Sequence, residues 1–303
     1  MKKIMGLLLG LVLTSGMVSF SAAQEKQQPG MSGPPKVLVV SREFLKPGRS
    51  GMTHEKSESA FVQAMARANW PTHYLAMDSM SGKTRALFLT GYDSLEAWEK
   101  DNRAVEKNKA LMTALDQAGV ADGNLLDATD QSVLVYDEEM SLRAPVDIAH
   151  MRYMEIQLFR IRPGHYQEWS AAVKMVKDAY EKAIPEAHWA TFRLVYGGAV
   201  GTYAVFTPLK SIAEVDQMIG SEKKFATAMG ENGMKKLSEL IAASIESREM
   251  NLFTFNPRMS YVSPDWVKAD PDFWKPQMKM ASGTPTKKPA EMKPAAAKSK
   301  MGQ

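Results

Sequence analysis

The sequence has no cysteine, only five histidines, and no long apolar run beyond its first residues. The absence of cysteine excludes disulfides, thiol catalysis and thiolate metal sites. The motifs G-x-S-x-G and H-E-x-x-H are also missing, which removes the usual signatures of a serine hydrolase and a zinc protease. No later stretch approaches the roughly 18 apolar residues of a membrane-spanning helix. The mature chain is therefore expected to be soluble and stabilised by burial of its core.

The first 23 residues have the pattern of a secretory signal peptide. Lys2 and Lys3 precede an apolar segment, 4–18, and Ser21 and Ala23 are small residues before a cleavage point. We predict cleavage after Ala23 and a periplasmic or secreted protein. Because no cysteine lies at the cleavage point, a lipid anchor is excluded.

Much of the positive charge lies at the two ends of the chain. Of the 38 Lys and Arg residues, six are lysines in segment 277–303 and two lie in 1–23, and only one of the 34 acidic residues lies in these segments. The remainder has 30 basic and 33 acidic residues, which argues against a nucleic-acid-binding face. Segment 277–303 is rich in Pro, Ala and Lys, and we predict a disordered tail that contacts anionic cell-envelope surfaces. Segment 24–35 is predicted to be a flexible leader.

Residues 36–143 have the element pattern β-α-β-β-α-β. A β-branched run predicts a first strand at 36–45, which ends before the turn at Pro47 and Gly48. The elements predicted after it are a helix around 55–68, strands at 72–79 and 85–92, a helical region that begins at a capping box with Ser94 and ends near 117, and a strand at 132–138.

The same pattern recurs in residues 150–257, where Pro163 and Gly164 repeat the earlier turn. Its helix has the clearest amphipathic pattern in the chain, with Trp169 on the apolar face. The predicted elements are a strand at 152–161, that helix, strands at 188–196 and 201–207, a helical region from a second capping box at Ser211 to about 247 with a break near 230–233, and a strand at 250–256.

The order β-α-β-β-α-β is that of the ferredoxin-like split unit. Two such units, each with a Pro-Gly turn at the entry to its first helix, resemble the dimeric α/β-barrel superfamily, which includes antibiotic-biosynthesis-monooxygenase-like and NIPSNAP-like domains. The resemblance covers 36–257 and implies an α+β fold, in which two tandem ferredoxin-like repeats pair sheet to sheet as a pseudo-dimeric barrel. Chance similarity of two α/β stretches is the alternative. Members of the superfamily include enzymes, haem proteins and binding proteins, so the resemblance does not fix an activity.

Alternation along the strand at 152–161 assigns its two faces. We expect Met154, Ile156 and Leu158 to face the helices. The other face is half polar and is expected to meet the opposite sheet around a cavity; it carries Tyr153, Glu155, Gln157 and Phe159. Segment 258–276 has aromatic residues without a period and is predicted to be an extended arm packed on the surface, or alternatively a docking strip for a partner.

Two histidines at matching places of the two repeats, His73 and His188, are the first candidate site residues. Brought together across a pseudo-twofold axis, they could bind a ligand, a metal or haem, or supply an acid–base group. No cofactor is predicted from the sequence. Because haem-binding relatives in this superfamily often use a histidine as the iron ligand, the resemblance leaves haem open without assigning the ligand position to a residue of this chain. The alternative is that both are turn residues inherited by duplication, and no metal site is assigned from the sequence.

Glu155, Gln157 and Arg193 are polar residues inside otherwise apolar strands. Facing a cavity, they could orient a small polar group, and Glu155 could act as a base. The leading hypothesis is a protein that binds a small apolar or aromatic molecule in an inter-sheet cavity. The alternatives are a cofactor-free or haem-dependent monooxygenase-like enzyme and a surface interaction protein that acts through its arm and tail. The oligomeric state is left open.

Overall fold

The computed structural model describes residues 33–275. The predicted signal peptide, the tail and most of the leader lie outside the described residues. Within the described part, no helix is both long and apolar enough to cross a membrane.

Each half of the described chain supplies four strands. The first half comprises β1 (Val37–Leu45), α1 (Met52–Arg67), β2 (Tyr74–Ser79), β3 (Arg85–Tyr92), α2 (Leu95–Lys107), α3 (Lys109–Gly123) and β4 (Leu126–Leu142). The second half comprises the short helix η1 (Ile148–His150), β5 (Tyr153–Ile161), α4 (Tyr166–Ala183), β6 (Trp189–Tyr196), β7 (Thr202–Leu209), α5 (Ala213–Gly220), α6 (Glu222–Ser244) and β8 (Ile245–Phe255). Two short helices follow, α7 (Pro264–Ala269) and α8 (Pro271–Trp274).

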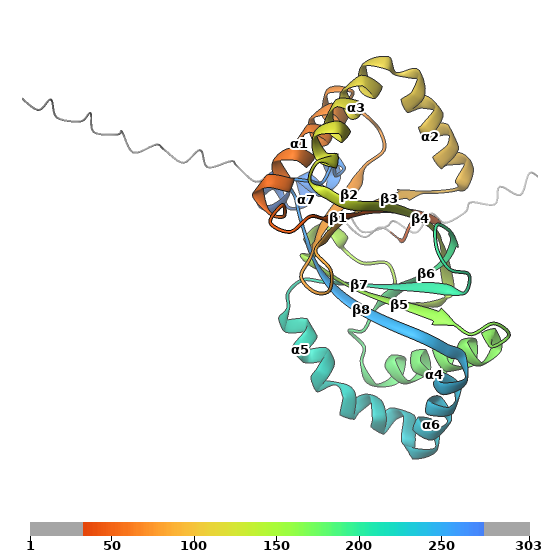
Figure 1. The fold of residues 1–303 in the computed structure, drawn as a ribbon. Coiled ribbons are helices and arrows are strands. Elements are labelled where there is room, and N and C mark those ends of the chain that lie inside the picture. Colours follow the sequence, from red (N-terminus) through yellow and green to blue (C-terminus); the bar gives the residue numbers. More distant parts are fainter. Residues whose placement is uncertain (1–32, 276–303) are drawn as a thin grey trace, which may run out of the picture.

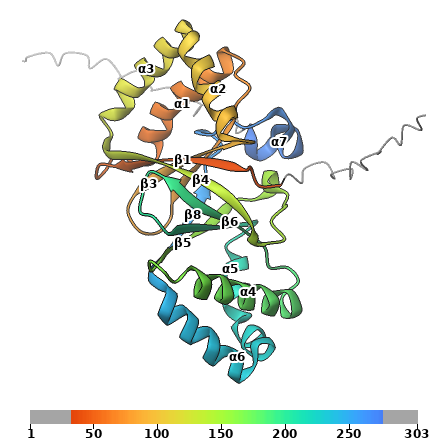
Figure 2. The same ribbon diagram turned by 90° about the vertical axis from the view of Figure 1, so that its right-hand side faces the viewer.

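The strands form one closed antiparallel barrel in the order β1-β3-β2-β8-β5-β7-β6-β4 (Figures 1 and 2). The closed barrel expected from the sequence is thus confirmed. The sheet of each half has the same internal order, β4-β1-β3-β2 in the first and β8-β5-β7-β6 in the second. Two seams join the halves: β2 pairs with β8 over three residue pairs, and β4 pairs with β6. Strand β4 is 17 residues long; its first part pairs with β1 and its last part with β6, and Val133, Leu134 and Val135 pair with both.

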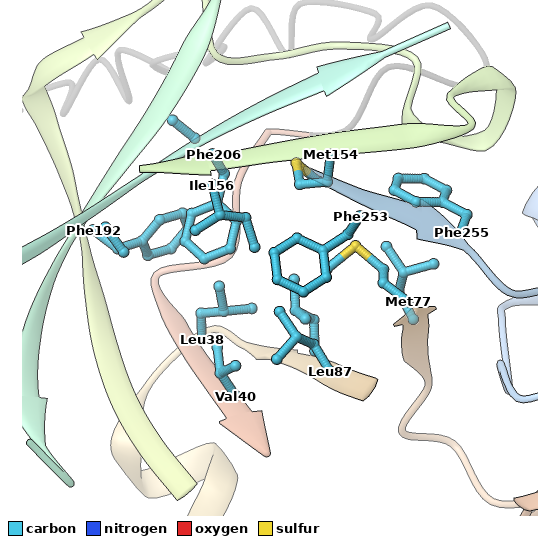
Figure 3. Close-up of a cluster of buried hydrophobic side chains, with 14 of the residues drawn as sticks. Leu38, Val40, Met77, Leu87, Met154, Ile156, Phe192, Phe206, Phe253 and Phe255 are labelled. Atoms are coloured by element: carbon cyan, nitrogen blue, oxygen red, sulfur yellow. The ribbon is translucent and has the colours of Figure 1, made fainter. Parts of the chain in front are cut away.

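Apolar side chains from both sheets fill the barrel between its walls (Figure 3). Leu38 and Leu87 point inward from the first sheet, and Met154 and Ile156 point inward from the second. The predicted faces of the strand at 152–161 are therefore wrong: its apolar set lies in the barrel and its half-polar set faces the helices. Both faces of this strand are covered, with Ile156 buried on one face and Glu155 on the other, so alternation alone could not tell which one meets the opposite sheet.

The helices cover the outside of the barrel, α1–α3 over the first sheet and α4–α6 over the second (Figures 1 and 2). Ser94 caps α2 as predicted, since its hydroxyl accepts a hydrogen bond from the Ala97 N–H at 3.0 Å. The predicted cap at Ser211 is wrong, because α5 begins after Ile212 without a side-chain cap. The predicted break in the last helix is confirmed at Gly230, which has a φ of 71°.

Residues after β8 form the helices α7 and α8, not an extended arm. Trp274 is 5% exposed, packs against Phe255 and Trp266, and donates its indole N–H to the Ala149 carbonyl at 2.8 Å. The Arg152 guanidinium lies 4.0 Å from the centre of the Phe273 ring. The aromatic residues of this segment therefore cover the protein's own core, as the packing interpretation predicted.

The seam between β4 and β6 depends on a glycine. A Cβ atom at Gly197 would lie 2.0 Å from the Gln131 carbonyl oxygen, and its φ is +81°. Gly164 has a similar φ of +85° with no atom within 4 Å of its would-be Cβ.

We expect Gly164→Ala to lower the unfolding free energy by about 1 kcal/mol through backbone strain alone. Gly197→Ala should lower it by at least about 2 kcal/mol more, because relief of the clash requires a strand to move. Urea denaturation of the two variants checks this, and equal losses would contradict it.

The Trp274 side chain is expected to fix the C-terminal helices to the barrel. Trp274→Ala should lower the unfolding free energy by about 3–5 kcal/mol, as for other large buried aromatic residues. Val200→Ala is the control, because Val200 is 92% exposed and its loss should change stability by less than about 0.5 kcal/mol. Similar small effects of both changes would show that the segment contributes little to stability.

Candidate functional site

A cavity of about 810 Å³ lies between the outer face of the second sheet and helices α4, α5 and α6. We call it the helix-side cavity. Its walls are mainly apolar and aromatic and include Phe159, Trp169, Val173, Val176, Tyr180 and Ile241. The half-polar face of β5 therefore does meet a cavity, as predicted, but helices rather than the first sheet form the opposite wall.

Trp169 lines this cavity and has an unpaired hydrogen-bond donor. It lies on α4, is 5% exposed, and packs against Phe159 and Tyr203 with ring centres 5.0 and 5.7 Å apart. Its indole N–H is buried and has no hydrogen-bond partner among the described residues. Because nearly all buried donors in proteins are paired, this N–H calls for a partner, and a ligand that displaces the side chains covering it would supply one.

A chain of three polar side chains lies on the strands beside the cavity. The Gln157 amide donates to Glu155 Oε1 at 2.6 Å, and Arg248 Nη2 donates to Gln157 Oε1 at 2.7 Å. The Arg248 guanidinium also lies 5.3 Å from the centre of the Phe159 ring. Burial, followed by the charge of Glu155, raises the pKa of Tyr180, so its hydroxyl remains a neutral donor at the cavity wall. The structure thus places Glu155 and Gln157 together and adds Arg248; Gln157 and Arg248 line the cavity, whereas Glu155 does not.

A second cavity, of about 990 Å³, opens at one end of the barrel. Inner residues of both sheets line it, such as Leu38 and Phe206, and so do both His73 and His188. The expected inter-sheet cavity therefore exists at the mouth of the barrel, while packed side chains fill the barrel further in. His73 stacks on Tyr261 with ring centres 4.8 Å apart, and burial, partly offset by a hydrogen bond to the Pro71 backbone, lowers its pKa.

The ring nitrogens of His188 are both engaged. Nδ1 lies 3.0 Å from the Glu186 carbonyl oxygen, and Nε2 lies 2.8 Å from the Pro208 carbonyl oxygen. An axial ligand of haem needs a free ring nitrogen, so His188 does not fit that role in this arrangement. Arg193 is exposed on β6 and lines neither cavity, so it does not join the other predicted residues.

Two residues of the helix-side cavity were not among the sequence candidates. Trp169 was assigned to the apolar face of its helix, and that assignment is confirmed, but no sequence pattern shows that its N–H lacks a partner. Arg248 lies in the polar start of β8, and only the pairing of β5 with β8 places it opposite Phe159.

No protein-family model matches the sequence, and no curated protein matches it. Several solved structures resemble the fold. A candidate monooxygenase from Fusobacterium nucleatum is 10% identical, with a TM-score of 0.46 over 73% of this chain and 93% of the other. An anthrone oxidase-like protein is 11% identical, with a TM-score of 0.45 over 75% and 94% of the two chains. A variant of chlorite dismutase from Candidatus Nitrospira defluvii is 9% identical, with a TM-score of 0.42 over 74% and 92%. At these values the similarity concerns the fold alone.

Proposed function

We propose that this protein binds a small, mainly aromatic molecule that carries an acidic oxygen, and that it does so in the helix-side cavity. The unpaired, buried indole N–H of Trp169 is the observation that carries the proposal. A volume of about 810 Å³ is within the range of about 300–1,000 Å³ that is usual for small-molecule sites. Apolar walls with a few polar groups are typical of such sites.

Arg248 favours an anionic ligand over a neutral one. Within residues 33–275 its guanidinium forms no ion pair, and its described polar partner is the neutral Gln157 amide. A carboxylate could accept hydrogen bonds from an arginine and from an indole N–H, whereas a hydrocarbon could satisfy neither donor. The ring of such a ligand would pack against Phe159 and the apolar face of α4.

The test compares two probes of similar size, 2-naphthoate and naphthalene, by isothermal titration calorimetry. We expect naphthoate to bind at least about tenfold more tightly, because hydrogen bonds to a charged acceptor contribute about 1.5–3 kcal/mol. Trp169→Phe keeps an aromatic ring but removes the donor, and should weaken naphthoate binding on the order of tenfold without affecting naphthalene.

Trp98→Phe serves as the matched control, since Trp98 packs on the first sheet and lines neither cavity. Its naphthoate affinity should equal that of the unchanged protein. Equal affinity for both probes, or a Trp169→Phe variant that binds naphthoate normally, would refute the proposed site.

We also infer that the two halves derive from duplication of one ferredoxin-like unit. The shared strand order supports this, as do the Pro-Gly turns that precede α1 and α4. The glycines of these turns, Gly48 and Gly164, both have positive φ values, 75° and 85°.

The pattern of residues 1–23 supports the proposal that the chain is exported to the periplasm or beyond. Mass spectrometry of protein from a periplasmic fraction should show a chain that begins at Gln24. Recovery of a cytoplasmic chain that retains Met1 would contradict export.

A further inference from the structure

Four side chains from three elements of the first half converge under its helices. Glu43 lies on the outer face of β1, His54 and Glu58 lie one turn apart on α1, and Asp122 lies near the end of α3. His54 Nε2 lies 3.0 Å from Glu43 Oε2, 3.7 Å from Asp122 Oδ1 and 3.9 Å from Glu58 Oε1. We call these residues the imidazole–carboxylate cluster.

The cluster is buried and carries an excess of negative charge. The exposed fractions of His54, Glu58 and Asp122 are 1%, 3% and 1%, and the Glu43 side chain is 18% exposed. Among the described residues no lysine or arginine forms an ion pair with any of the three carboxylates. Buried carboxylates without a countercharge are costly, so something must balance them.

Several of the cluster's polar atoms also lack partners. Glu58 Oε1 and Asp122 Oδ1 are buried without a hydrogen bond in the described structure, although both point toward His54 Nε2. His54 Nδ1 is likewise buried without a partner among the described residues. A cation held between the carboxylate oxygens would supply the partner that they lack.

The second half shows that the fold does not require this charge. Glu43 lies four residues before Pro47, and the residue four before Pro163 is Phe159. Phe159 packs against Trp169 of α4 in an aromatic wall. A β1 side chain beneath α1 could thus be apolar, as it is beneath α4. The acidic residues in the first half therefore call for a ligand-binding explanation rather than a packing one.

We propose that Glu43, His54, Glu58 and Asp122 bind one divalent transition-metal ion, with zinc, manganese and iron as the fitting class. One imidazole nitrogen and three carboxylate oxygens are ligands that these ions share. Magnesium and calcium are disfavoured, since they prefer oxygen ligands throughout. Copper(I) is disfavoured by the absence of sulfur ligands.

The spacing of the ligand atoms suits such an ion. In a four-coordinate site with bonds of about 2.1 Å, neighbouring ligand atoms lie about 3.4 Å apart. All four ligand atoms of the cluster lie within 4.8 Å of one another, so small rotations of the side chains would bring them to the spacing of a four-coordinate site. We expect an ion to enter past Glu43, whose side chain is 18% exposed and is the least buried of the four. Within residues 33–275 no second group of three or more such ligands comes this close, so one ion per chain is expected.

The first test uses the full mature chain without a histidine tag, stripped with a chelator and then dialysed. Manganese(II) is titrated into the protein and the signal of the free ion is followed by electron paramagnetic resonance. We expect loss of one equivalent of free manganese and recovery of the signal when zinc(II) is added, because zinc binds nitrogen and oxygen sites more tightly. Zinc(II) should also raise the melting temperature in a concentration-dependent way.

Two isosteric variants locate the ion. Glu58→Gln and Asp122→Asn each remove one negative charge with little change in shape. Loss of an outer-shell partner of a metal ligand weakens metal binding by roughly tenfold to hundredfold. Each of these variants alters a direct ligand and should weaken manganese binding by more than that. In the absence of metal, both should melt at or above the temperature of the unchanged protein, since charge repulsion is relieved.

His165→Gln is the matched control, because His165 pairs with Glu168 at the entry to α4 but is only half-buried. Its manganese affinity and melting temperature should equal those of the unchanged protein. An unchanged protein that leaves the manganese signal intact and melts at the same temperature with or without zinc would overturn the proposal, whatever the variants do. Undiminished binding by both variants would overturn the assignment to this cluster.

Discussion

The mutual burial of two apolar sheet faces is the constraint on which the rest of this structure depends. Each half folds into a four-stranded sheet with helices on one side, and its other face would be bare in isolation. The inner faces of the two sheets cover each other, and Met77 and Phe253 at their junction are 0% and 1% exposed. Hydrogen bonds contribute less to one seam, since β2 and β8 share only three residue pairs. Apolar packing is therefore what holds the two halves together there.

The filled barrel determines where ligands can bind. Side chains occupy its centre, so space is left at its mouth and beneath the helices. Beneath the helices of the second half lies the helix-side cavity, and beneath those of the first half lies the imidazole–carboxylate cluster. The two halves use that room differently. The first places an imidazole and three carboxylates there, and the second places Phe159 and Trp169. One architecture thus provides one charged and one aromatic compartment.

Much of the fold could be predicted because its elements have clear periods. Alternation identified the strands, helical spacing identified α4, and the repeated Pro-Gly turns aligned the halves. The faces of β5 could not be assigned, since both Ile156 on one face and Glu155 on the other are buried. The prediction of a cap at Ser211 was wrong for a different reason. A capping box expresses only a local preference, and α5 begins after Ile212 instead.

The sites were less predictable because they depend on contacts between distant segments. His54 and Glu58 have the spacing of neighbours on one helix face, which the sequence shows, but Asp122 joins them only because α3 packs on α1. The two histidines that were candidates from the sequence, His73 and His188, share a cavity but not a common partner. The His188 ring lies 3.0 Å from the Glu186 carbonyl oxygen and 2.8 Å from the Pro208 carbonyl oxygen, so it links a loop to the end of β7. A residue type that often binds ligands serves here as a structural link.

The two compartments are expected to act independently. Coupling between distant sites needs an element with two alternative arrangements that both sites influence. Between the imidazole–carboxylate cluster and the helix-side cavity lies the packed barrel, whose interior side chains leave little room for a second arrangement. The helices over the first sheet and those over the second lie on opposite sides of the barrel (Figures 1 and 2). A movement of α4 on ligand binding would therefore not be transmitted through the packed barrel to α1. We expect ligand binding in one half to leave the site of the other half unchanged.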